Sequence, residues 1–391
     1  MMKFDRTIYP VGQGAFYGER FIENDIIKFQ IVYDCGSTTS NKKGNTEALD
    51  KAIAAFASKP ADIDYMFVSH FDEDHVNGII KLYNECKIKC ILLPLIRYKW
   101  LAYASCRTLT SYRSLTRFLN FLDENQEIRV IMIGDEEDSF SADDVQYTPL
   151  LKRNFTVHRS GTALYQLATS SITQLVWEYI PINNFKYAIS DIKLLEIKIE
   201  KLFSPPVSID DIWSKAGVMD NKKCHEINDV YKKIFHDANQ PSMIVYSGLQ
   251  SDNPYTLTTR KFDKFFMYGY IPGFYKSQRL SYGEACLYTG DCTLKRERCT
   301  DIYSILKNKV DHIGLIQLPH HGSWHNLTIS RLKEKAQISL AGKVFFASFG
   351  TFNVYRHPSY KIIQDVLMNS AFFRGVTNLS ASIYEEIILF P

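Results

Sequence analysis

The chain reads DYMFVSHFDEDH from residue 64 to residue 75. Its first half, residues 64–69, is short and rich in aromatic and β-branched side chains, which predicts a buried strand. Four side chains able to bind a metal follow within six residues: His70, Asp72, Asp74 and His75. Carboxylates at a strand end are costly to bury without a compensating positive charge, and a divalent cation supplies one. A solvated acidic turn is the alternative, but it gives no reason for a His at both ends.

Strands and helices alternate on both sides of this stretch. Before it we expect a strand over residues 29–35 and a helix over 47–58, which Thr46 can cap and Pro60 ends. After it we expect a helix over 77–86 and a strand over 89–93. The same order returns near the C-terminus, with strands over 243–246, 286–289, 310–318 and 344–349, a helix over 294–306 and another that opens at Pro358. Two such blocks predict an α/β fold in which two sheets pack together with helices outside.

The region between the two blocks, residues 95–239, is less regular. It holds a helical segment over 98–123, a strand over 128–133 and a polar segment around Trp177. We expect a single domain over residues 1–391, with 95–239 as an insertion or elaborated region within it.

Composition places the chain among ordinary globular proteins. It has 391 residues, 46% of them hydrophobic and 23% charged, and its net charge of +3 gives no general attraction to polyanions. No apolar run approaches the ~20 residues that cross a bilayer, and the N-terminus lacks the apolar core of a secretory signal. The eight cysteines show no paired spacing, which is typical of reduced thiols in a core. We therefore expect a cytoplasmic protein without membrane contact.

Three later segments also place polar residues directly after predicted strands. They are Thr289-Gly290-Asp291, Pro319-His320-His321-Gly322-Ser323, and Asn353-Val354-Tyr355-Arg356-His357-Pro358. Each has a plain structural alternative: a common turn, a pair of core histidines bonded to backbone, and a helix cap. Together with residues 70–75 they gather five of the ten histidines, which favours a shared site.

These segments resemble the metallo-β-lactamase superfamily and, more narrowly, the hydrolase domain of the ComEC competence proteins. The matching pieces are Val11-Gly12-Gln13-Gly14, Asp34-Cys35-Gly36-Ser37, Ser69 through His75 with Asn77-Gly78, Asn239 and Ser242, and the three later segments. The resemblance covers about residues 1–93 and 239–391 and leaves the middle unexplained.

The resemblance implies a four-layer αββα sandwich, with a central insertion in this chain, and a two-metal site between the sheets. By position, His70 and Asp72 would hold one metal, and Asp291 would bridge the two ions. The other metal would be held by Asp74, His75 and His320. Asp34 would orient ligands rather than bind metal.

Four further residues at the expected site have no ligand role in this reading. His321, Ser323 and His357 remain for phosphate contact or leaving-group protonation, and Arg356 can meet a phosphate oxygen. The catalytic set expected from the resemblance is therefore Asp74, Asp291, His321 and His357.

The chain departs from the superfamily pattern at the first metal position. Asp72 stands where the superfamily usually has His, a substitution that ComEC-type members share. A separate His ligand has no clear counterpart, since only His158, His225 and His236 are available. A harder donor set shifts preference from Zn²⁺ toward Mn²⁺ or Mg²⁺, although the general affinity order favours zinc. We expect two divalent ions, Mn or Zn, with Mg as an alternative.

Two such cations suit phosphodiester hydrolysis, because they can activate a water and stabilise the departing oxygen. We expect a nuclease acting on DNA, with nucleic acid or a nucleotide as the partner. The alternatives are a hydrolase of cyclic nucleotides or other esters, and a non-catalytic regulatory module on the same scaffold. The aromatic segment over residues 261–275 could stack bases if exposed, or form an ordinary hairpin or subunit contact if buried.

Overall fold

The computed structural model describes residues 2–39, 47–96, 108–134, 151–169, 174–183, 188–207, 212, 217–235, 242–250, 260–261, 283–294 and 296–389. The aromatic segment over 261–275 lies outside these residues from position 262 onward, and so do His236 and Asn239. None of the helices in the described ranges is both long and apolar enough to span a bilayer.

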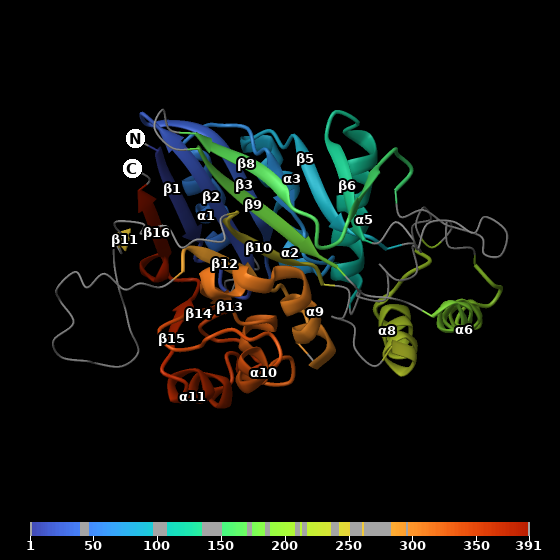
Figure 1. Ribbon diagram of the computed structural model, residues 1–391. Helices are drawn as coiled ribbons and strands as arrows, with labels where there is room; N and C mark the ends of the chain where they lie inside the picture. Colours follow the sequence, from blue (N-terminus) through green and yellow to red (C-terminus); the bar gives the residue numbers. More distant parts are fainter. Residues whose placement is uncertain are drawn as a thin grey trace.

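The first sheet has nine strands in the order β11-β16-β1-β2-β3-β4-β5-β6-β7. Strands β3 to β7 run parallel, whereas β11, β16, β1, β2 and β3 pair antiparallel. The strands span Met2–Ile8 (β1), Gly14–Glu23 (β2), Ile26–Ser37 (β3), Tyr65–Phe67 (β4), Cys90–Pro94 (β5), Arg129–Gly134 (β6), Thr156–Arg159 (β7), Arg260–Lys261 (β11) and Tyr384–Leu389 (β16). The two ends of the chain therefore meet in one sheet, where β1 pairs with β16 (Figure 1).

The second sheet has seven strands in the order β15-β14-β13-β12-β10-β9-β8. Strands β12 to β15 are parallel, and β8, β9, β10 and β12 pair antiparallel. They span Leu164–Thr169 (β8), Gln174–Ile182 (β9), Ile244–Leu249 (β10), Ala285–Tyr288 (β12), Ile313–Gln317 (β13), Val344–Ser348 (β14) and Phe372–Val376 (β15). Short apolar runs with five buried residues in a row, as in β13 and β14, are typical of parallel strands covered on both faces.

Three hydrophobic cores define four layers. One core joins the first sheet to its helices, a second lies between the sheets, and a third joins the second sheet to its helices. On the first sheet lie α1 (Glu47–Ala57), α2 (Glu73–Val76), α3 (Ile79–Glu85) and α5 (Leu109–Glu124). Two further helices, α6 (Ile189–Glu200) and α8 (Asn221–Phe235), pack against each other, and α8 contacts α5 (Figure 1). On the second sheet lie α9 (Arg296–Leu306), α10 (Ile329–Glu334) and α11 (Tyr360–Met368). The expected αββα sandwich is confirmed by this order of layers (Figure 1).

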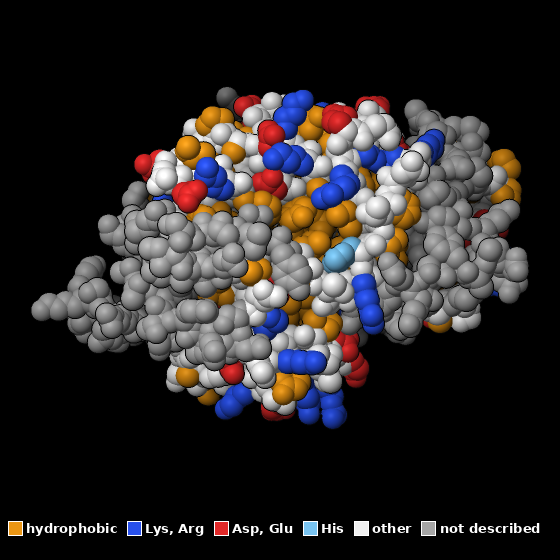
Figure 2. All heavy atoms as spheres, turned by 45° about the horizontal axis from the view of Figure 1, so that its top comes forward, with side chains coloured by type: hydrophobic (Ala, Val, Ile, Leu, Met, Phe, Trp, Pro, Cys, Tyr) orange, Lys and Arg blue, Asp and Glu red, His pale blue; other side chains and the backbone are white. Residues whose placement is uncertain are grey.

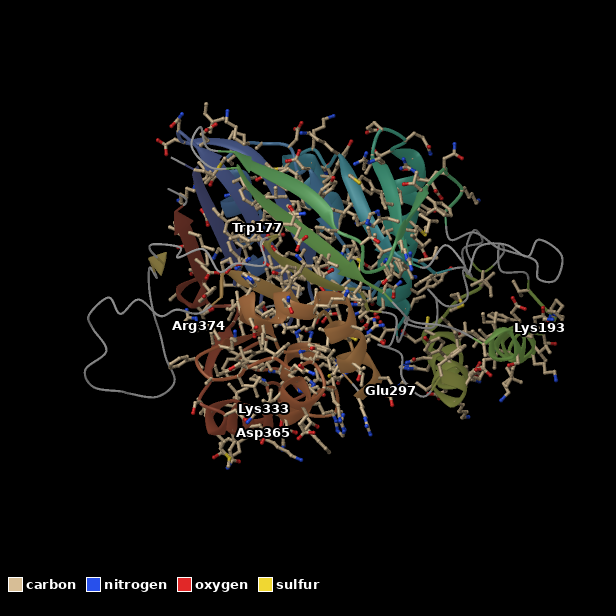
Figure 3. The ribbon with its side chains drawn as sticks, viewed as in Figure 1. Trp177, Lys193, Glu297, Lys333, Asp365 and Arg374 are labelled. Atoms are coloured by element: carbon tan, nitrogen blue, oxygen red, sulfur yellow. The ribbon has the colours of Figure 1, made fainter. Side chains whose placement is uncertain are left out.

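Described parts of residues 95–239 belong to both sheets. Strands β6 and β7 extend the first sheet, and β8 and β9 extend the second. The segment around Trp177 reads as polar in sequence but is the strand β9, and the Trp177 ring is fully buried between the sheets (Figure 3). Its indole Nε1 donates a hydrogen bond to Ser247 Oγ at 3.0 Å, which satisfies the polar edge of the ring.

A buried ion cluster links the two sheets beside Trp177. The Arg6 guanidinium lies 2.7 Å from Glu19 Oε1 and 2.6 Å from Glu386 Oε2. Ser247 and Tyr288, from the second sheet, donate hydrogen bonds to the Glu19 carboxylate at 2.7 and 2.8 Å. The charges are paired and hydrogen-bonded, as burial requires.

On the outside, Lys, Arg, Asp and Glu side chains are mixed over the face shown in Figure 2.

Candidate metal centre

The candidate site collects the segments that follow parallel strands of both sheets. Residues 70–75 follow β4, Asp291 follows β12, and His320 and His321 follow β13. Strands that run parallel end at one edge of their sheet, so side chains just beyond them meet. Seven His and Asp side chains converge in this way, from parts of the chain more than 200 residues apart.

One group of ligand atoms is formed by His70, His75 and Asp291, all buried and within 4.8 Å of one another. Asp291 lies between the two rings, with Oδ1 3.3 Å from His75 Nε2 and Oδ2 3.7 Å from His70 Nε2. Asp72 Oδ2 lies 3.6 Å from His70 Nε2, and His320 Nε2 lies 3.6 Å from Asp291 Oδ2. The three separations of 3.6–3.7 Å are too long for hydrogen bonds and leave room for an ion among the atoms.

A second group is formed by Asp74, His75 and His321. Asp74 Oδ2 lies 3.0 Å from His321 Nε2, and Asp74 Oδ1 lies 4.0 Å from His75 Nε2. We expected His320 beside Asp74 and His75; the structure places His321 against Asp74, and His320 Nε2 lies 3.6 Å from Asp291 Oδ2. Which of the two histidines binds a cation stays a prediction. Adjacent histidines diverge here since both have positive φ, 50° and 55°, a turn too tight for both rings to face one side.

Unsatisfied buried atoms mark the place between these groups. His70 Nε2, His75 Nε2 and Asp291 Oδ1 are buried and make no hydrogen bond within the described part of the chain. Buried polar atoms left unpaired cost about 1–3 kcal/mol each, more when charged. Three such atoms facing one another, of the imidazole and carboxylate types that bind divalent cations, fit a metal site.

Asp34 fixes the orientation of His75. The Asp34 carboxylate accepts hydrogen bonds from Ser69 N and Ser69 Oγ, each at 2.7 Å, and from His75 Nδ1 at 2.8 Å. A carboxylate only accepts, so Nδ1 of His75 carries a proton and Nε2, the nitrogen left for a cation, faces Asp74 and Asp291. Asp34 therefore stands where it can orient a ligand without being one.

Gly36 lets the first sheet approach this loop. A Cβ at Gly36 would lie 2.5 Å from the Asp74 carbonyl carbon, a distance that only a glycine allows. Gly36 belongs to one of the segments that carry the family resemblance, and this close approach explains why a glycine is needed there.

Gln317, at the end of β13, is a site residue that the sequence analysis did not single out. Its Oε1 accepts hydrogen bonds from the backbone N–H groups of Thr289 and Gly290 at 2.9 and 3.1 Å. Its Nε2 donates to the Tyr17 hydroxyl at 3.3 Å, and that hydroxyl donates to Ser348 Oγ at 3.2 Å. Gln317 thereby holds the turn that presents Asp291. A lone buried amide at a strand end carries no sequence signal that separates it from ordinary core residues.

The electrostatics follow from these contacts. Burial alone would raise the pKa of Asp74, but His75 and His321 hold it well below its usual range. Burial likewise opposes the effect on Asp291, where His320 and His75 lower the pKa of the carboxyl. Burial would lower the pKa of His75, and Asp34, Asp291 and Asp74 raise it well above its usual value. Burial would lower the pKa of His321, but the hydrogen bond that its ring donates to Asp74, together with the charges of Asp291 and Asp74, raises it.

His357 borders the centre from the loop after β14. Its ring centroid lies 5.6 Å from that of His320, and its buried Nδ1 makes no hydrogen bond among the described residues. Burial, together with the nearby His320 and His321, lowers the pKa of His357 to about 4. Ser323 is buried in the same turn as the two histidines, and Arg356 is exposed on the loop.

The two described candidates for a separate His ligand lie elsewhere. His158 is on β7 and contacts the Thr162 carbonyl at 3.0 Å, and His225 is exposed on α8. His236 is outside the described residues. Ser69 Oγ lies 2.9 Å from His70 Nδ1, and the His and Asp atoms grouped near His70 Nε2 among the described residues come from Asp72, Asp291 and His75.

No protein-family model and no curated protein matches the sequence. Among solved structures, the chain is similar to a HARLDQ-motif mutant of a metallo-beta-lactamase from Cronobacter sakazakii, with 14% identity, a TM-score of 0.22 and coverage of 44% of this chain and 49% of that one. It is also similar to a long form RNase Z from yeast, with 15% identity, a TM-score of 0.23 and coverage of 47% and 27%.

A third similar structure is ST1585 from Sulfolobus tokodaii, an archaeal metallo-beta-lactamase superfamily protein, with 15% identity, a TM-score of 0.19 and coverage of 45% and 54%. The chain thus spans about half or less of the length of these three proteins. The TM-scores of these matches are low, so the fold is described from this chain's own sheet order and its three hydrophobic cores.

Proposed function

We propose that this protein is a metal-dependent hydrolase that cleaves phosphodiester bonds, with DNA as its substrate. One observation carries the proposal: unpaired atoms of His70, His75 and Asp291 face one another beside the pair formed by Asp74 and His321. The motif resemblance to the ComEC hydrolase domain adds the substrate class. The two groups of ligand atoms share His75, and Asp291 presents one oxygen to each side, as a bridging carboxylate would.

Each residue has a role in this proposal. His70, Asp72, His320 and Asp291 would hold one divalent cation, and Asp74, His75, His321 and Asp291 the other. Bound there, the cations would supply an activated water and stabilise negative charge on the departing oxygen. Asp34 keeps the Nε2 lone pair of His75 pointing at the centre, and the Gln317 side chain keeps the Asp291 turn in place.

His357 and Arg356 would contact the substrate. With a pKa of about 4, His357 is neutral at pH 7 and would have to give up its last proton to act as an acid. We therefore assign it to phosphate contact and not to protonation of the leaving group. Arg356 is exposed one residue earlier, where its guanidinium can reach a phosphate oxygen. Ser323 is buried beside them and would position the turn.

The donor set favours manganese over zinc. Three carboxylates, of Asp72, Asp74 and Asp291, stand among the ligand atoms, and no cysteine sulfur does within the described residues. Carboxylate oxygens suit Mn²⁺ and Mg²⁺, whereas the imidazoles also suit Zn²⁺. We propose Mn²⁺ as the preferred ion.

The test is an activity assay of the purified chain with Mn²⁺, Zn²⁺ or Mg²⁺. The substrates are single- and double-stranded DNA, RNA and cyclic nucleotides. We expect Mn²⁺-dependent DNA cleavage that Asp74→Ala abolishes and that Asp365→Ala, on the outer helix α11, retains. Cleavage of small phosphodiesters only would overturn the nuclease assignment. Absence of both bound metal and cleavage would indicate the regulatory alternative.

A further inference from the structure

Exposed aromatic side chains are confined to one part of the described chain. Trp324 is 47% exposed, Phe352 97%, Tyr355 62% and Tyr360 79%, and every other described Phe, Tyr or Trp side chain is buried or half-buried. Leaving such rings in water forgoes about 1.5–3 kcal/mol each relative to burial. We call these four side chains the aromatic surface. In a chain that buries its other described aromatics, their exposure indicates a binding role.

The aromatic surface borders the candidate metal centre. The Tyr355 ring stacks on His357 with centroids 6.0 Å apart and planes 13° from parallel, and His357 in turn lies 5.6 Å from His320. Trp324 directly follows the turn that bears the two site histidines. The backbone N–H of Ser359 donates to the Gly322 carbonyl at 3.0 Å, which joins the loop of Tyr355 to the turn of Trp324.

The loop that carries Phe352 and Tyr355 is held in shape by Asn353. The Asn353 amide donates to the carbonyls of Gly350 and His357 at 2.8 and 2.7 Å, and accepts from His357 N–H at 2.9 Å. One side chain thus closes the loop across five residues. The rings are presented on a fixed frame, so little ordering entropy is lost when a ligand stacks on them.

The same region is positively charged. Residues 324–361 contain a single acidic residue, Glu334, although the whole chain has 43 acidic against 46 basic residues. The exposed cations of this stretch are Arg331, Lys333, Arg356 and Lys361. Lys361 Nζ lies 4.9 Å from the Trp324 ring. Figure 3 labels Lys333 on α10 and Asp365 on α11 at the lower end of the molecule.

We propose that the aromatic surface binds the bases of a single-stranded nucleic acid on one side of the bond that is cut. Aromatic rings stack on any base, and cations among them follow the phosphate backbone. Bases in a duplex are already stacked on each other, so a single strand fits this surface best. The inference rests on the proposed phosphodiesterase function, because the metal centre next to the rings would hold the scissile phosphate.

The test is strand binding without turnover. The probe is a fluorescein-labelled dT12 strand in EDTA at low ionic strength, read by fluorescence anisotropy. We expect the full chain to bind the strand, and Tyr355→Ala and Trp324→Ala each to raise Kd about tenfold, since one stacked base is worth about 1–3 kcal/mol. Tyr355→Phe keeps the ring and should stay within about twofold of the parent.

Two variants are matched controls. Met368→Ala removes an exposed apolar side chain (74% exposed) from the far end of α11, and Lys193→Ala removes an exposed cation from α6, far from α10 and α11 in Figure 3. Both should bind the strand like the parent chain. Circular dichroism of every variant shows that the fold is kept.

Three results would overturn the inference. In the first, the parent chain does not bind the strand. In the second, Tyr355→Ala and Trp324→Ala bind the strand with the Kd of the parent. In the third, the rings are needed for binding to phosphatidylglycerol vesicles and not for binding to the strand. Because the assay needs no cleavage, it separates the two proposals. If the strand binds through the rings but no phosphodiester is cleaved, only the proposed function is contradicted. If DNA is cleaved but both variants bind the strand as the parent does, only the proposed role of the aromatic surface is contradicted.

Discussion

His75 Nδ1 lies 2.8 Å from Asp34 Oδ2, and this contact turns Nε2 of the same ring toward Asp291, 3.3 Å away. Asp34 sits in the first sheet and Asp291 follows a strand of the second. The ring of His75 therefore spans the interval between the two sheets, with Nδ1 bonded to Asp34 on one side and Nε2 directed to the candidate centre on the other. The candidate centre depends on this orientation.

Asp34→Asn should weaken metal binding while leaving the fold intact. The amide has the shape of the carboxylate but can present a donor to His75 Nδ1, which would move the ring proton to Nε2. We expect the Kd for Mn²⁺, measured by titration calorimetry, to rise about 10–100-fold. Asp365→Asn on α11 is the matched control. Equal affinity in parent and Asp34→Asn would show that the contact does not orient a ligand.

Metal affinity should increase with pH. Burial would lower the pKa of His75 and of His321, but the three carboxylate neighbours of His75 and the bond of His321 to Asp74 raise both pKa values above the usual His range, so the metal-free rings keep their second proton to a higher pH than a free imidazole does. A ring must lose that proton to bind a cation. As the pH rises through and above the usual His range, the Kd for Mn²⁺ should therefore fall, with protons released. Calorimetry in two buffers of different ionisation enthalpy measures the release, and a buffer-independent enthalpy would contradict it.

Gln317→Leu should disturb the Asp291 turn. It leaves the N–H groups of Thr289 and Gly290 buried without their acceptor, at a cost of about 1–3 kcal/mol in the free energy of unfolding. Because that turn presents Asp291, the Kd for Mn²⁺ should rise as well. Gln317→Glu keeps both acceptor bonds and should restore most of the affinity. If urea unfolding shows the loss of stability but Mn²⁺ binds as in the parent, Gln317 has no positioning role.

Arg6→Met should strongly destabilise the sandwich. It leaves the buried carboxylates of Glu19 and Glu386 without their cation, a loss of about 3–5 kcal/mol in the free energy of unfolding. Lys51→Met, which breaks the exposed pair with Glu47 on α1, is the matched control and should cost at most about 0.5 kcal/mol. Urea unfolding of the two variants gives the comparison; equal losses would mean that the Arg6 cluster does not join the sheets.

The sequence predicted the elements with strong local signals. The helix expected over residues 47–58 is α1 (Glu47–Ala57), and the strand expected over 344–349 is β14 (Val344–Ser348). The N-terminal hairpin of β1 and β2 was missed, because its inner face carries the charged Arg6 and Glu19, and the other residues that satisfy them in the core lie far along the chain. The strand around Trp177 was missed for a similar reason, because the indole N–H finds its partner, Ser247, 70 residues further along the chain.

The site could be predicted in its members but not in its pairings. The spacing of residues 70–75 and the motif order pointed to every His and Asp that the structure brings together. Which of His320 and His321 faces Asp74 depends on two positive φ angles in one turn, and no sequence pattern encodes them. Gln317 was missed because its role lies in a hydrogen bond to a turn 28 residues away.

Counting the metal ions bound per chain tests the central claim most directly. The purified protein is dialysed against Mn²⁺ and the bound metal is measured by inductively coupled plasma mass spectrometry. About two ions per chain are predicted for the parent, near zero to one for Asp291→Ala, and two for the control Asp365→Ala. No bound metal in the parent, or two ions in Asp291→Ala, would contradict the account.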